Sequence, residues 1–422
     1  MRHYQLGALF STLHTGKDVS MKYNFDEIVD RRGTNSMNVE GFRGYIFGTY
    51  PGIEFPYTDD EFIRMWVADM EFSTAPEIIE AIKERADRKI FGYTNLYDDR
   101  YYRAFSAWCR KLYGWDFPQE QLVFTLGVVA ALYELVGDLV PEGKKVLTLT
   151  PAYSYFLHAA EHNQRELVSS PLKKDAQGHF TIDWEDLEQK AADPDVAVLI
   201  LCNPHNPTGR IWTWEELDRL SQLIQKNDLW VISDEIHCDV LRSDRRHTPL
   251  GKVMPDYQKL VTCMSASKAF NLAGMMMSNI IVRDEALRNL MHFHETCDMN
   301  PLSIAAVQAA YEKGYDWLME LRAYLDANFD YMERFFAQRI PAAVVTKAEA
   351  TYLAWIDMNQ VLPGVEDLPL FFAQKAGVLL EGGNSLFVGN AKGYIRLNLA
   401  MPRSMLAKGL EHIAAAIEGY QA

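Results

Sequence analysis

Between about residues 120 and 285, short apolar segments alternate with amphipathic ones, and this alternation constrains the fold more than any other feature of the chain. The apolar segments are rich in Val, Ile and Leu: KKVLTLT, VAVLILC, LWVIS, KLVTCM and SNIIV. Such runs are typical of strands that are buried on both faces of a sheet. Between them lie helical patterns such as TWEELDRLSQLIQKND, where Thr213 and Glu216 have the spacing of a capping box. This order predicts an α/β fold, with a large domain whose mostly parallel sheet is flanked by helices.

The pattern changes after Pro301. A long helical region, SIAAVQAAYEKGYDWLMELRAYLDANFDYMERFFAQR, is followed by the strand-like segments AEATYLAWIDM and GYIRLNLA and by a closing helical pattern. We therefore predict a second, smaller α+β domain at the C-terminal end. The predicted organisation is an extension at residues 1–20, an N-terminal arm at 21–60 that packs with the small domain, the large domain at 61–302, and the small domain at 303–422.

Charge and cysteine usage exclude several classes of function. The formal net charge is −15 and the chain has no run of five or more basic residues, whereas nucleic acids and anionic membranes need a positive surface. No apolar segment approaches the roughly 18 residues of a membrane span. The five cysteines are widely spaced and never form a C-x-x-C pair, which favours a reducing cytoplasm and argues against a structural metal site. A small-molecule substrate is compatible with all of these features.

Three polar motifs follow three of the predicted strands. NPHNPTG (203–209) follows VAVLILC, SDEIH (233–237) follows LWVI, and SASK (265–268) follows KLVTCM. In a parallel α/β sheet, ligands bind beyond the carboxyl ends of the strands, so the three motifs are expected to meet in one pocket. Lys268 could bond covalently to a carbonyl there, if burial and nearby positive charge lower the pKa of its amine. The alternative is a lysine that extends along the surface into solvent.

Pyridoxal phosphate requires the groups that these motifs supply. It needs a lysine for an imine and a carboxylate opposite its ring nitrogen, and Asp234 at the end of a buried strand suits the second role. Asn206 is placed to donate to the phenolic oxygen of the cofactor. Each residue also has an ordinary structural interpretation: Asp234 as the N-cap of a helix, and NPHNPTG as a rigid turn.

Further candidates come from other segments. Gly127, Val128 and Val129 open a helical pattern after a short apolar run, and a helix N-terminus of this kind binds phosphate. Tyr153, in TPAYSY, could stack on the cofactor ring or simply pack. Arg396 is a lone cation in an apolar strand and must be paired, either with the α-carboxylate of an amino-acid substrate or with an internal acid.

The motifs NPHNPTG, SDEIH, SASKAFNLAG and YIRLNLA, in this order, resemble the fold-type I pyridoxal-phosphate enzymes of the aminotransferase class I/II superfamily. Within that superfamily, the segments DRRGTNS, MWVADMEF, FGYTN, SDEIHCDV and IRLNLAMPR are similar to the MalY/PatB-type C–S lyases, or cystathionine β-lyase-like proteins. The matching segments extend from about residue 24 to 403, and the resemblance makes residues 61–302 the cofactor-binding domain.

The resemblance implies a role for each candidate. Lys268 would form the imine and act as a catalytic base, Asp234 would pair with the pyridine nitrogen, and Asn206 would bond the phenolic oxygen. The remaining implied cofactor contacts are Tyr153 on the ring, His237 beside the phenolic oxygen, and Gly127, Val128, Val129, Ser265 and Ser267 around the phosphate.

Members of the family are homodimers with shared active sites. By similarity, Tyr93 would reach the phosphate bound by the partner subunit, and Arg396 would bind the substrate α-carboxylate. The chain also departs from the family pattern. Met276 stands where many aminotransferases have an arginine for the phosphate, and Glu71 stands where the lyases usually have an aspartate. The N-terminal signature reads Asn-Val-Glu at residues 38–40 in place of Lys-Trp-Asp.

The implied activity is β-elimination from cystathionine or a related cysteine S-conjugate, giving a thiol, pyruvate and ammonia, with Lys268, Asp234 and Tyr153 as the catalytic residues. The same residues could also serve an aminotransferase, which would require a keto acid as second substrate. A third possibility is a regulatory binding protein, but a chain with that role alone would have no need of Lys268. The expected location is the cytoplasm.

Overall fold

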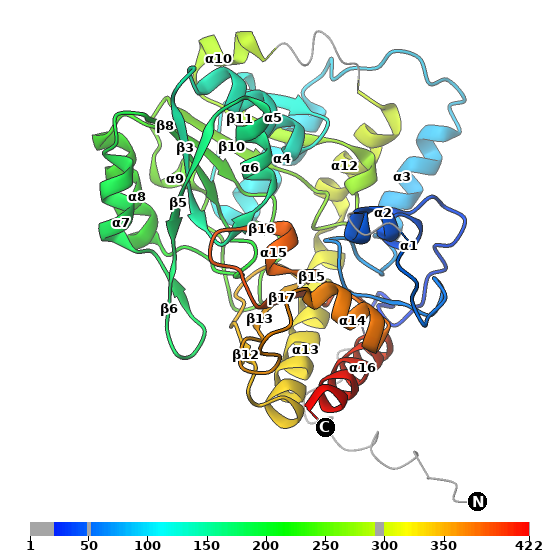
Figure 1. Cartoon of the computed structure of the whole chain (residues 1–422). Helices are drawn as coiled ribbons and strands as arrows, with labels where there is room; N and C mark the ends of the chain where they lie inside the picture. The colour runs from blue at the N-terminus through cyan, green and yellow to red at the C-terminus, as the bar shows by residue number, and fades with distance from the viewer. Residues whose placement is uncertain (1–20, 49–51, 292–298, 422) are drawn as a thin grey trace, which may run out of the picture.

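A seven-stranded sheet forms the centre of the large domain (Figure 1). The structure is a computed structural model that describes residues 21–48, 52–291 and 299–421, so the predicted extension at 1–20 lies outside the described residues. The strand order is β2-β11-β10-β9-β8-β3-β5. The strands are β2 (Leu122–Thr125), β3 (Lys145–Thr150), β5 (Glu166–Pro171), β8 (Val196–Cys202), β9 (Trp230–Asp234), β10 (Leu260–Met264) and β11 (Ser278–Val282). The predicted mostly parallel sheet is thus confirmed.

β11 runs antiparallel to both of its neighbours, β10 and β2. Between β10 and β11 the chain forms turns and only a short 3₁₀ helix, η2 (Ala273–Met275), so it does not cross a face of the sheet as a parallel connection must. The chain therefore turns back at the carboxyl end of β10. This turn carries Lys268 and keeps it at the sheet edge where the parallel strands end.

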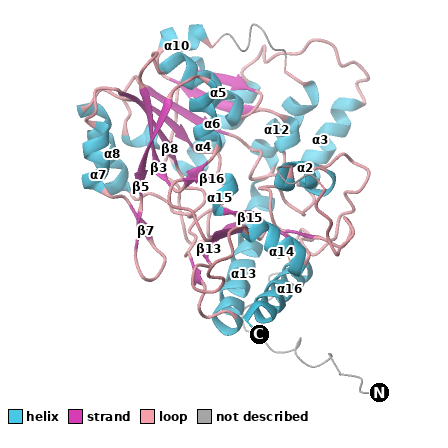
Figure 2. Ribbon diagram, in the orientation of Figure 1, coloured by secondary structure: helices cyan, strands magenta, loops and turns pink. Residues whose placement is uncertain are grey.

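Helices cover both faces of this sheet (Figure 2). Along β8, Val198 and Ile200 pack in one apolar cluster with α5 and α6, whereas Leu199 and Leu201 pack in another with α7 and α8. The strand is therefore buried on both faces, as its uninterrupted apolar sequence predicts. The helices in this part of the chain are α3 (Pro76–Ala86), α4 (Arg100–Tyr113), α5 (Val128–Leu139), α6 (Tyr155–His162), α7 (Trp184–Ala191), α8 (Trp214–Lys226), α9 (Leu250–Val253), α10 (Glu285–Leu290) and α12 (Pro301–Lys313), the last of which crosses the predicted domain boundary at 302. The capping box is present at the start of α8.

A four-stranded sheet with the order β12-β13-β17-β15 lies in the C-terminal part of the chain. Its pairs are antiparallel, and its strands are β12 (Val344–Val345), β13 (Leu353–Asp357), β15 (Glu381–Gly382) and β17 (Tyr394–Asn398). The accompanying helices are α13 (Tyr315–Arg339), α14 (Leu368–Ala376), α15 (Gly383–Leu386) and α16 (Arg403–Gln421). Apolar side chains of α13, α14 and α16 pack with this sheet in one cluster.

The long helical region after Pro301 is divided into α12 and α13 at Gly314. A Cβ atom at this position would lie 2.5 Å from the ring of Phe270, so the two helices meet where only glycine fits. The sequence predicts a helical region here, and the structure forms it as two helices.

The N-terminal segment packs against the C-terminal one. β1 (Ile63–Arg64) pairs in parallel with β14 (Val378–Leu379), and Phe42, Phe62 and Trp66 share an apolar cluster with Leu379. The remaining elements are α1 (Met37–Glu40), α2 (Phe42–Phe47), η1 (Gln119–Gln121), β4 (Ala152–Tyr153), β6 (Lys173–Lys174), β7 (Phe180–Thr181) and β16 (Phe387–Val388). No helix in the described part of the chain has the length and apolar character needed to span a membrane.

Candidate active site

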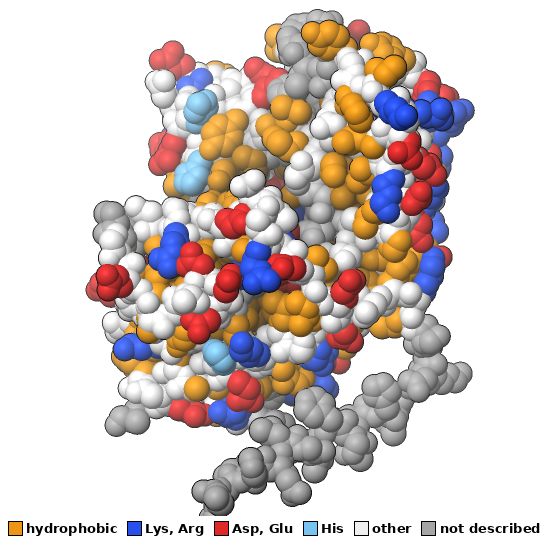
Figure 3. Space-filling model, turned by 90° about the vertical axis from the view of Figure 1, so that its right-hand side faces the viewer, with side chains coloured by type: hydrophobic (Ala, Val, Ile, Leu, Met, Phe, Trp, Pro, Cys, Tyr) orange, Lys and Arg blue, Asp and Glu red, His pale blue; other side chains and the backbone are white. Residues whose placement is uncertain are grey.

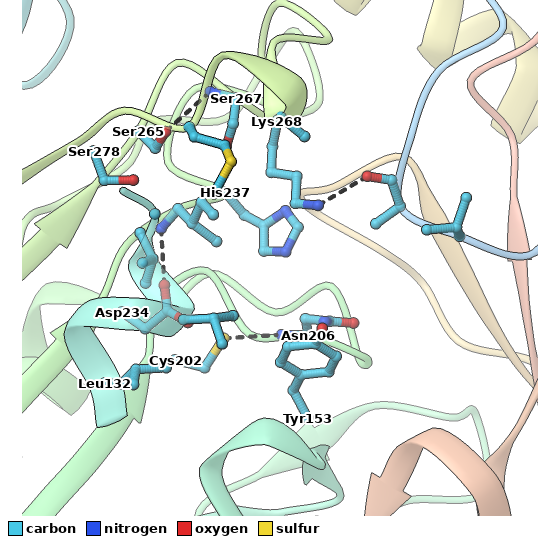
Figure 4. Close-up of a pocket in the computed structure, with 18 of the residues that line it drawn as sticks. Leu132, Tyr153, Cys202, Asn206, Asp234, His237, Ser265, Ser267, Lys268 and Ser278 are labelled. Atoms are coloured by element: carbon cyan, nitrogen blue, oxygen red, sulfur yellow. Dashed lines mark hydrogen bonds between the residues drawn. The ribbon is translucent and has the colours of Figure 1, made fainter. Parts of the chain in front are cut away.

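One pocket lies at the carboxyl ends of β8, β9 and β10 and is closed on another side by residues of β15 and β17 (Figure 4). The structure brings the predicted site residues together there, with the exception of Tyr93. The predicted residues that line the pocket are Gly127, Val128, Val129, Tyr153, Asn206, Asp234, His237, Ser265, Ser267, Lys268 and Arg396. Three strand ends thus converge on one cavity, as the positions of the motifs predict.

Lys268 points into this pocket and donates a hydrogen bond from Nζ to the carbonyl oxygen of Ala68, at 2.8 Å. Burial lowers the pKa of its amine to about 8, and the positive charge of Arg396 acts in the same direction. About a tenth of the amine is therefore neutral at pH 7, against less than about a thousandth for a lysine with the ordinary pKa. A lysine directed into solvent would have neither of these features, so the structure favours the chemical interpretation of Lys268 over the surface one.

Asp234 is the last residue of β9 and is 6% exposed. Its neighbours in register are Cys202 on β8 and Cys263 on β10, so a carboxyl group is held between apolar strands. Burial raises the pKa of Asp234 to about 7. Oδ1 accepts a hydrogen bond from the backbone N–H of Ile236 at 3.2 Å, within a turn, so the residue is not a helix N-cap. A buried carboxyl facing a pocket suits a cationic ring nitrogen.

His237 lies near Lys268 in the view of Figure 4. Its ring is buried, and Nδ1 has no hydrogen-bond partner among the described residues. Burial, Lys268 and Arg396 together lower the pKa of this imidazole to about 3, so the ring is neutral. A neutral ring with an unsatisfied polar atom beside the pocket can bond to a polar atom of a ligand.

Arg396 crosses the pocket wall from β17 and is 2% exposed. Nη1 donates to Oδ1 of Asn206 at 3.3 Å, and Nη2 donates to the carbonyl oxygen of Trp66 at 3.2 Å. Both acceptors are neutral. No acid within the described residues lies within ion-pair distance of this guanidinium, although the charge of Glu381 on the paired strand acts on it. A buried arginine held in this way can still receive a carboxylate from a ligand.

The N-terminus of α5 forms another part of the pocket wall. Gly127 precedes the helix with φ +147°, provides no side-chain cap, and has open space where a Cβ atom would lie. The first N–H groups of the helix, including those of Val128 and Val129, have no acceptor within the helix. Ser265 and Ser267 lie on the pocket wall, and Ser265 Oγ accepts from the backbone N–H of Ser267 at 3.1 Å. This part of the pocket wall therefore fits a phosphate group.

Several pocket residues were not found from the sequence. Tyr45 and Glu381 line the pocket, together with Ser278. Glu381 is an acid in the apolar stretch GVLLEGG, the same signal that drew attention to Arg396, so it could have been found. Tyr45 comes from an N-terminal segment whose pattern carries no indication of a site.

Tyr93 lies away from this pocket and is 94% exposed. Its segment, residues 87–99, connects α3 to α4. The predicted role of Tyr93 in a partner subunit's site therefore stays a prediction.

The fold and this pocket are those of an enzyme family that comparison with known proteins identifies. Residues 61–413 match the family Aminotransferase class I and II, and the chain belongs to it. Cystathionine beta-lyase PatB of Bacillus subtilis is 37% identical over 93% of this chain and 100% of its own, and protein MalY of Escherichia coli is 31% identical over 94% and 99%. The crystal structure of the PLP-bound C-S lyase from Staphylococcus hominis, complexed with the inhibitor L-cycloserine, has a TM-score of 0.91 and 48% identity, covering 94% of this chain and 99% of that one. These matches confirm the resemblance that the motifs indicate.

Proposed function

We propose that this protein is a pyridoxal-phosphate-dependent carbon–sulfur lyase that acts on cystathionine or a related cysteine S-conjugate, giving a thiol, pyruvate and ammonia. The observation that carries the proposal is Lys268, with a pKa of about 8, in one pocket with Asp234 and Arg396. The names of the relatives support it, because the two curated proteins and the solved structure above include a cystathionine β-lyase and a C-S lyase.

The pocket residues fit pyridoxal phosphate at each of its polar ends. The N-terminus of α5, Ser265 and Ser267 would hold the phosphate, and the buried carboxyl of Asp234 would hold a proton on the ring nitrogen. The face of Tyr153 and the polar atoms of Asn206 and His237 supply the remaining contacts, as the family pattern implies. When bound, the cofactor supplies an electron sink for the pair of electrons left at the α-carbon after proton removal.

The side chains of the chain itself perform the other tasks. Arg396 binds the α-carboxylate of the substrate and so fixes the direction of the Cα–H bond. Lys268, neutral once it is free of the cofactor, accepts the α-proton at Nζ, because a base with a pKa near the working pH is the most effective. The partial burial of Lys268 and the nearby charge of Arg396 maintain the lowered pKa that suits the amine to this transfer.

A single experiment separates the lyase from the aminotransferase. The purified protein is incubated with L-cystathionine, with and without a keto acid, and pyruvate, ammonia and transferred amino groups are measured separately. Pyruvate and ammonia in equal amounts without a keto acid support the lyase. Turnover that requires a keto acid would assign the protein to the aminotransferases. Borohydride reduction followed by peptide mapping tests the cofactor site independently, with the label expected on Lys268 and on no other lysine.

We also propose a homodimer in which Tyr93 completes the phosphate site of the partner subunit. The segment of residues 87–99 supports this, because it exposes Ile90, Phe91, Tyr93 and Tyr97 by 73%, 55%, 94% and 87%. Figure 3 views the side on which this segment lies in Figure 1 and shows hydrophobic side chains gathered there. The cytoplasm is the proposed location, which agrees with the free state of Cys109, Cys202, Cys238 and Cys263. Size-exclusion chromatography with light scattering tests the dimer.

A further inference from the structure

Glu381 stands directly opposite Arg396 in the small sheet. The two residues are register partners on the antiparallel strands β15 and β17, so their side chains project from the same face. Both side chains line the pocket, and they are 3% and 2% exposed. The buried carboxyl group of Glu381 therefore lies beside Arg396, the residue that is proposed to bind the substrate α-carboxylate.

Among the described residues, Arg396 and the phenols of Tyr45 and Tyr153 act on Glu381 or respond to it. Arg396 favours the ionised form of Glu381, whereas burial raises the pKa of this carboxyl and is the larger effect. Tyr45 from α2 and Tyr153 from β4 lie close enough for Glu381 to raise the pKa of each. Since Arg396 is otherwise held by the neutral oxygens of Asn206 and Trp66, Glu381 is its counter-charge in this wall of the pocket.

We propose that Glu381 couples substrate binding to proton uptake: it balances the charge of Arg396 in the free site and becomes protonated when a substrate carboxylate binds Arg396. This inference rests on the proposed function and deepens it, because it concerns how the same site receives a carboxylate. The step transfers one proton from solvent to a carboxylate oxygen of Glu381 and breaks no other bond.

The reason is electrostatic. A second carboxylate at Arg396 shares the single positive charge that favours the ionised form of Glu381, and two carboxylates in one buried site cannot both remain ionised at little cost. The pKa of Glu381 is therefore higher in the complex than in the free site. Binding is tightest at a pH below the pKa of the free site, and it weakens by up to about tenfold per pH unit until the pKa of the complex is reached.

The test is isothermal titration calorimetry of the holoenzyme with 3-(methylthio)propionate, a carboxylate that lacks the α-amino group and so cannot react with the cofactor. Titrations in buffers of different ionisation enthalpy, from pH 5 to 8, give the number of protons taken up on binding. The variant is Glu381→Gln, and the matched control is Glu71→Gln. Glu71 is also a buried acid with a raised pKa, but its hydrogen bond is to Asn38 at 2.6 Å and its ion pair is with Arg31.

The wild type and the Glu71→Gln protein are expected to take up a proton on binding, and their affinity should fall with rising pH. The Glu381→Gln protein should bind the probe with smaller uptake and with a flatter pH profile. In the holoenzyme Lys268 would be joined to the cofactor, and any proton uptake there is common to all three proteins and cancels in the comparison.

Two outcomes would overturn the proposal: no proton uptake by the wild type, or undiminished uptake by Glu381→Gln. The first outcome is measured on the wild type alone, so the proposal can be refuted even if the Glu381→Gln protein does not fold. The pyruvate assay on the same preparation keeps the two proposals apart. Loss of the lyase function would appear as absent elimination from cystathionine, whereas the calorimetric result depends only on a carboxylate at Arg396.

Discussion

Replacing Arg396 with lysine tests whether this residue binds substrate or only stabilises the fold. A lysine keeps the charge but cannot offer two parallel donors, so one charge-assisted hydrogen bond to the carboxylate is lost, a change of about 1.5 to 3 kcal/mol. We expect kcat/KM for every α-amino acid substrate to fall by roughly 10- to 100-fold. KM should rise, and kcat should fall as well because the Cα–H bond is no longer held in line with Lys268.

The structural cost of the same change is expected to be modest. Arg396 has two hydrogen bonds to neutral acceptors, on Asn206 at 3.3 Å and Trp66 at 3.2 Å, and because the lysine ammonium can keep one of them the expected loss is about 1.5 kcal/mol. A broken buried ion pair would cost about 3 to 5 kcal/mol. Steady-state kinetics and thermal unfolding are measured on one preparation, with cofactor content as the count of sites. Arg322→Lys is the matched control, because this buried arginine of α13 donates to the carbonyl oxygen of Asp239 and does not line the pocket.

The control should lose stability while its KM stays unchanged. Unchanged kinetics per folded site in Arg396→Lys, combined with a large loss of stability, would refute the reasoning. Arg396 would then be a structural residue.

Three other changes have expected outcomes. Asp234→Asn should raise the melting temperature of the apoprotein at pH 8 but not at pH 4. The pKa of Asp234 in the folded protein, about 7, lies above its ordinary value. The free energy of unfolding of the wild type therefore falls by up to about 4 kcal/mol as the pH rises from the ordinary pKa to the folded one. Calorimetric melting of the two apoproteins at both pH values checks this, and an Asp234→Asn variant that melts below the wild type at pH 8 would contradict it. Glu235→Ala should lower the free energy of unfolding by about 3 kcal/mol or more, because Glu235 is fully buried and bonded to His247 at 2.7 Å, and denaturant unfolding measures this loss. Tyr93→Phe should weaken cofactor retention during dialysis without dissociating the dimer, and unchanged retention would remove Tyr93 from the site.

The sequence predicts the large domain well because its signals are local. Strands buried on both faces need uninterrupted apolar runs, and β8 shows the result with alternate residues in two different clusters. The reversed direction of β11 is not visible in its sequence, SNIIV, whose Ile-Ile-Val run resembles those of the parallel strands of the same sheet. The direction depends on the connection before it, and the turns around Lys268 carry no pattern that distinguishes a return from a crossover.

The residues of the candidate site likewise fall into those that the sequence predicts and those that it does not. Lys268, Asp234 and Asn206 follow predicted strands, so the rule that ligands bind at strand ends places them together without knowledge of the fold. Tyr45 and Glu381 reach the pocket through packing between segments that are remote in sequence, and no local pattern encodes such contacts. The carbonyl oxygen of Ala68 is invisible for a different reason, since any residue at that position would present the same acceptor to Lys268.

The pairing of β1 with β14 has a consequence for the order in which the protein assembles on the ribosome. Residues 63–64 are synthesised more than three hundred residues before their partners at 378–379. At about 5 to 20 residues per second, this separation corresponds to some tens of seconds. Throughout that time Phe62 and Trp66, buried in the finished protein, lack the part of their cluster that Ala373 and Leu379 supply. The nascent chain therefore carries an incompletely covered aromatic cluster until translation is nearly complete, and this cluster is where a chaperone that recognises unfolded apolar chain would bind.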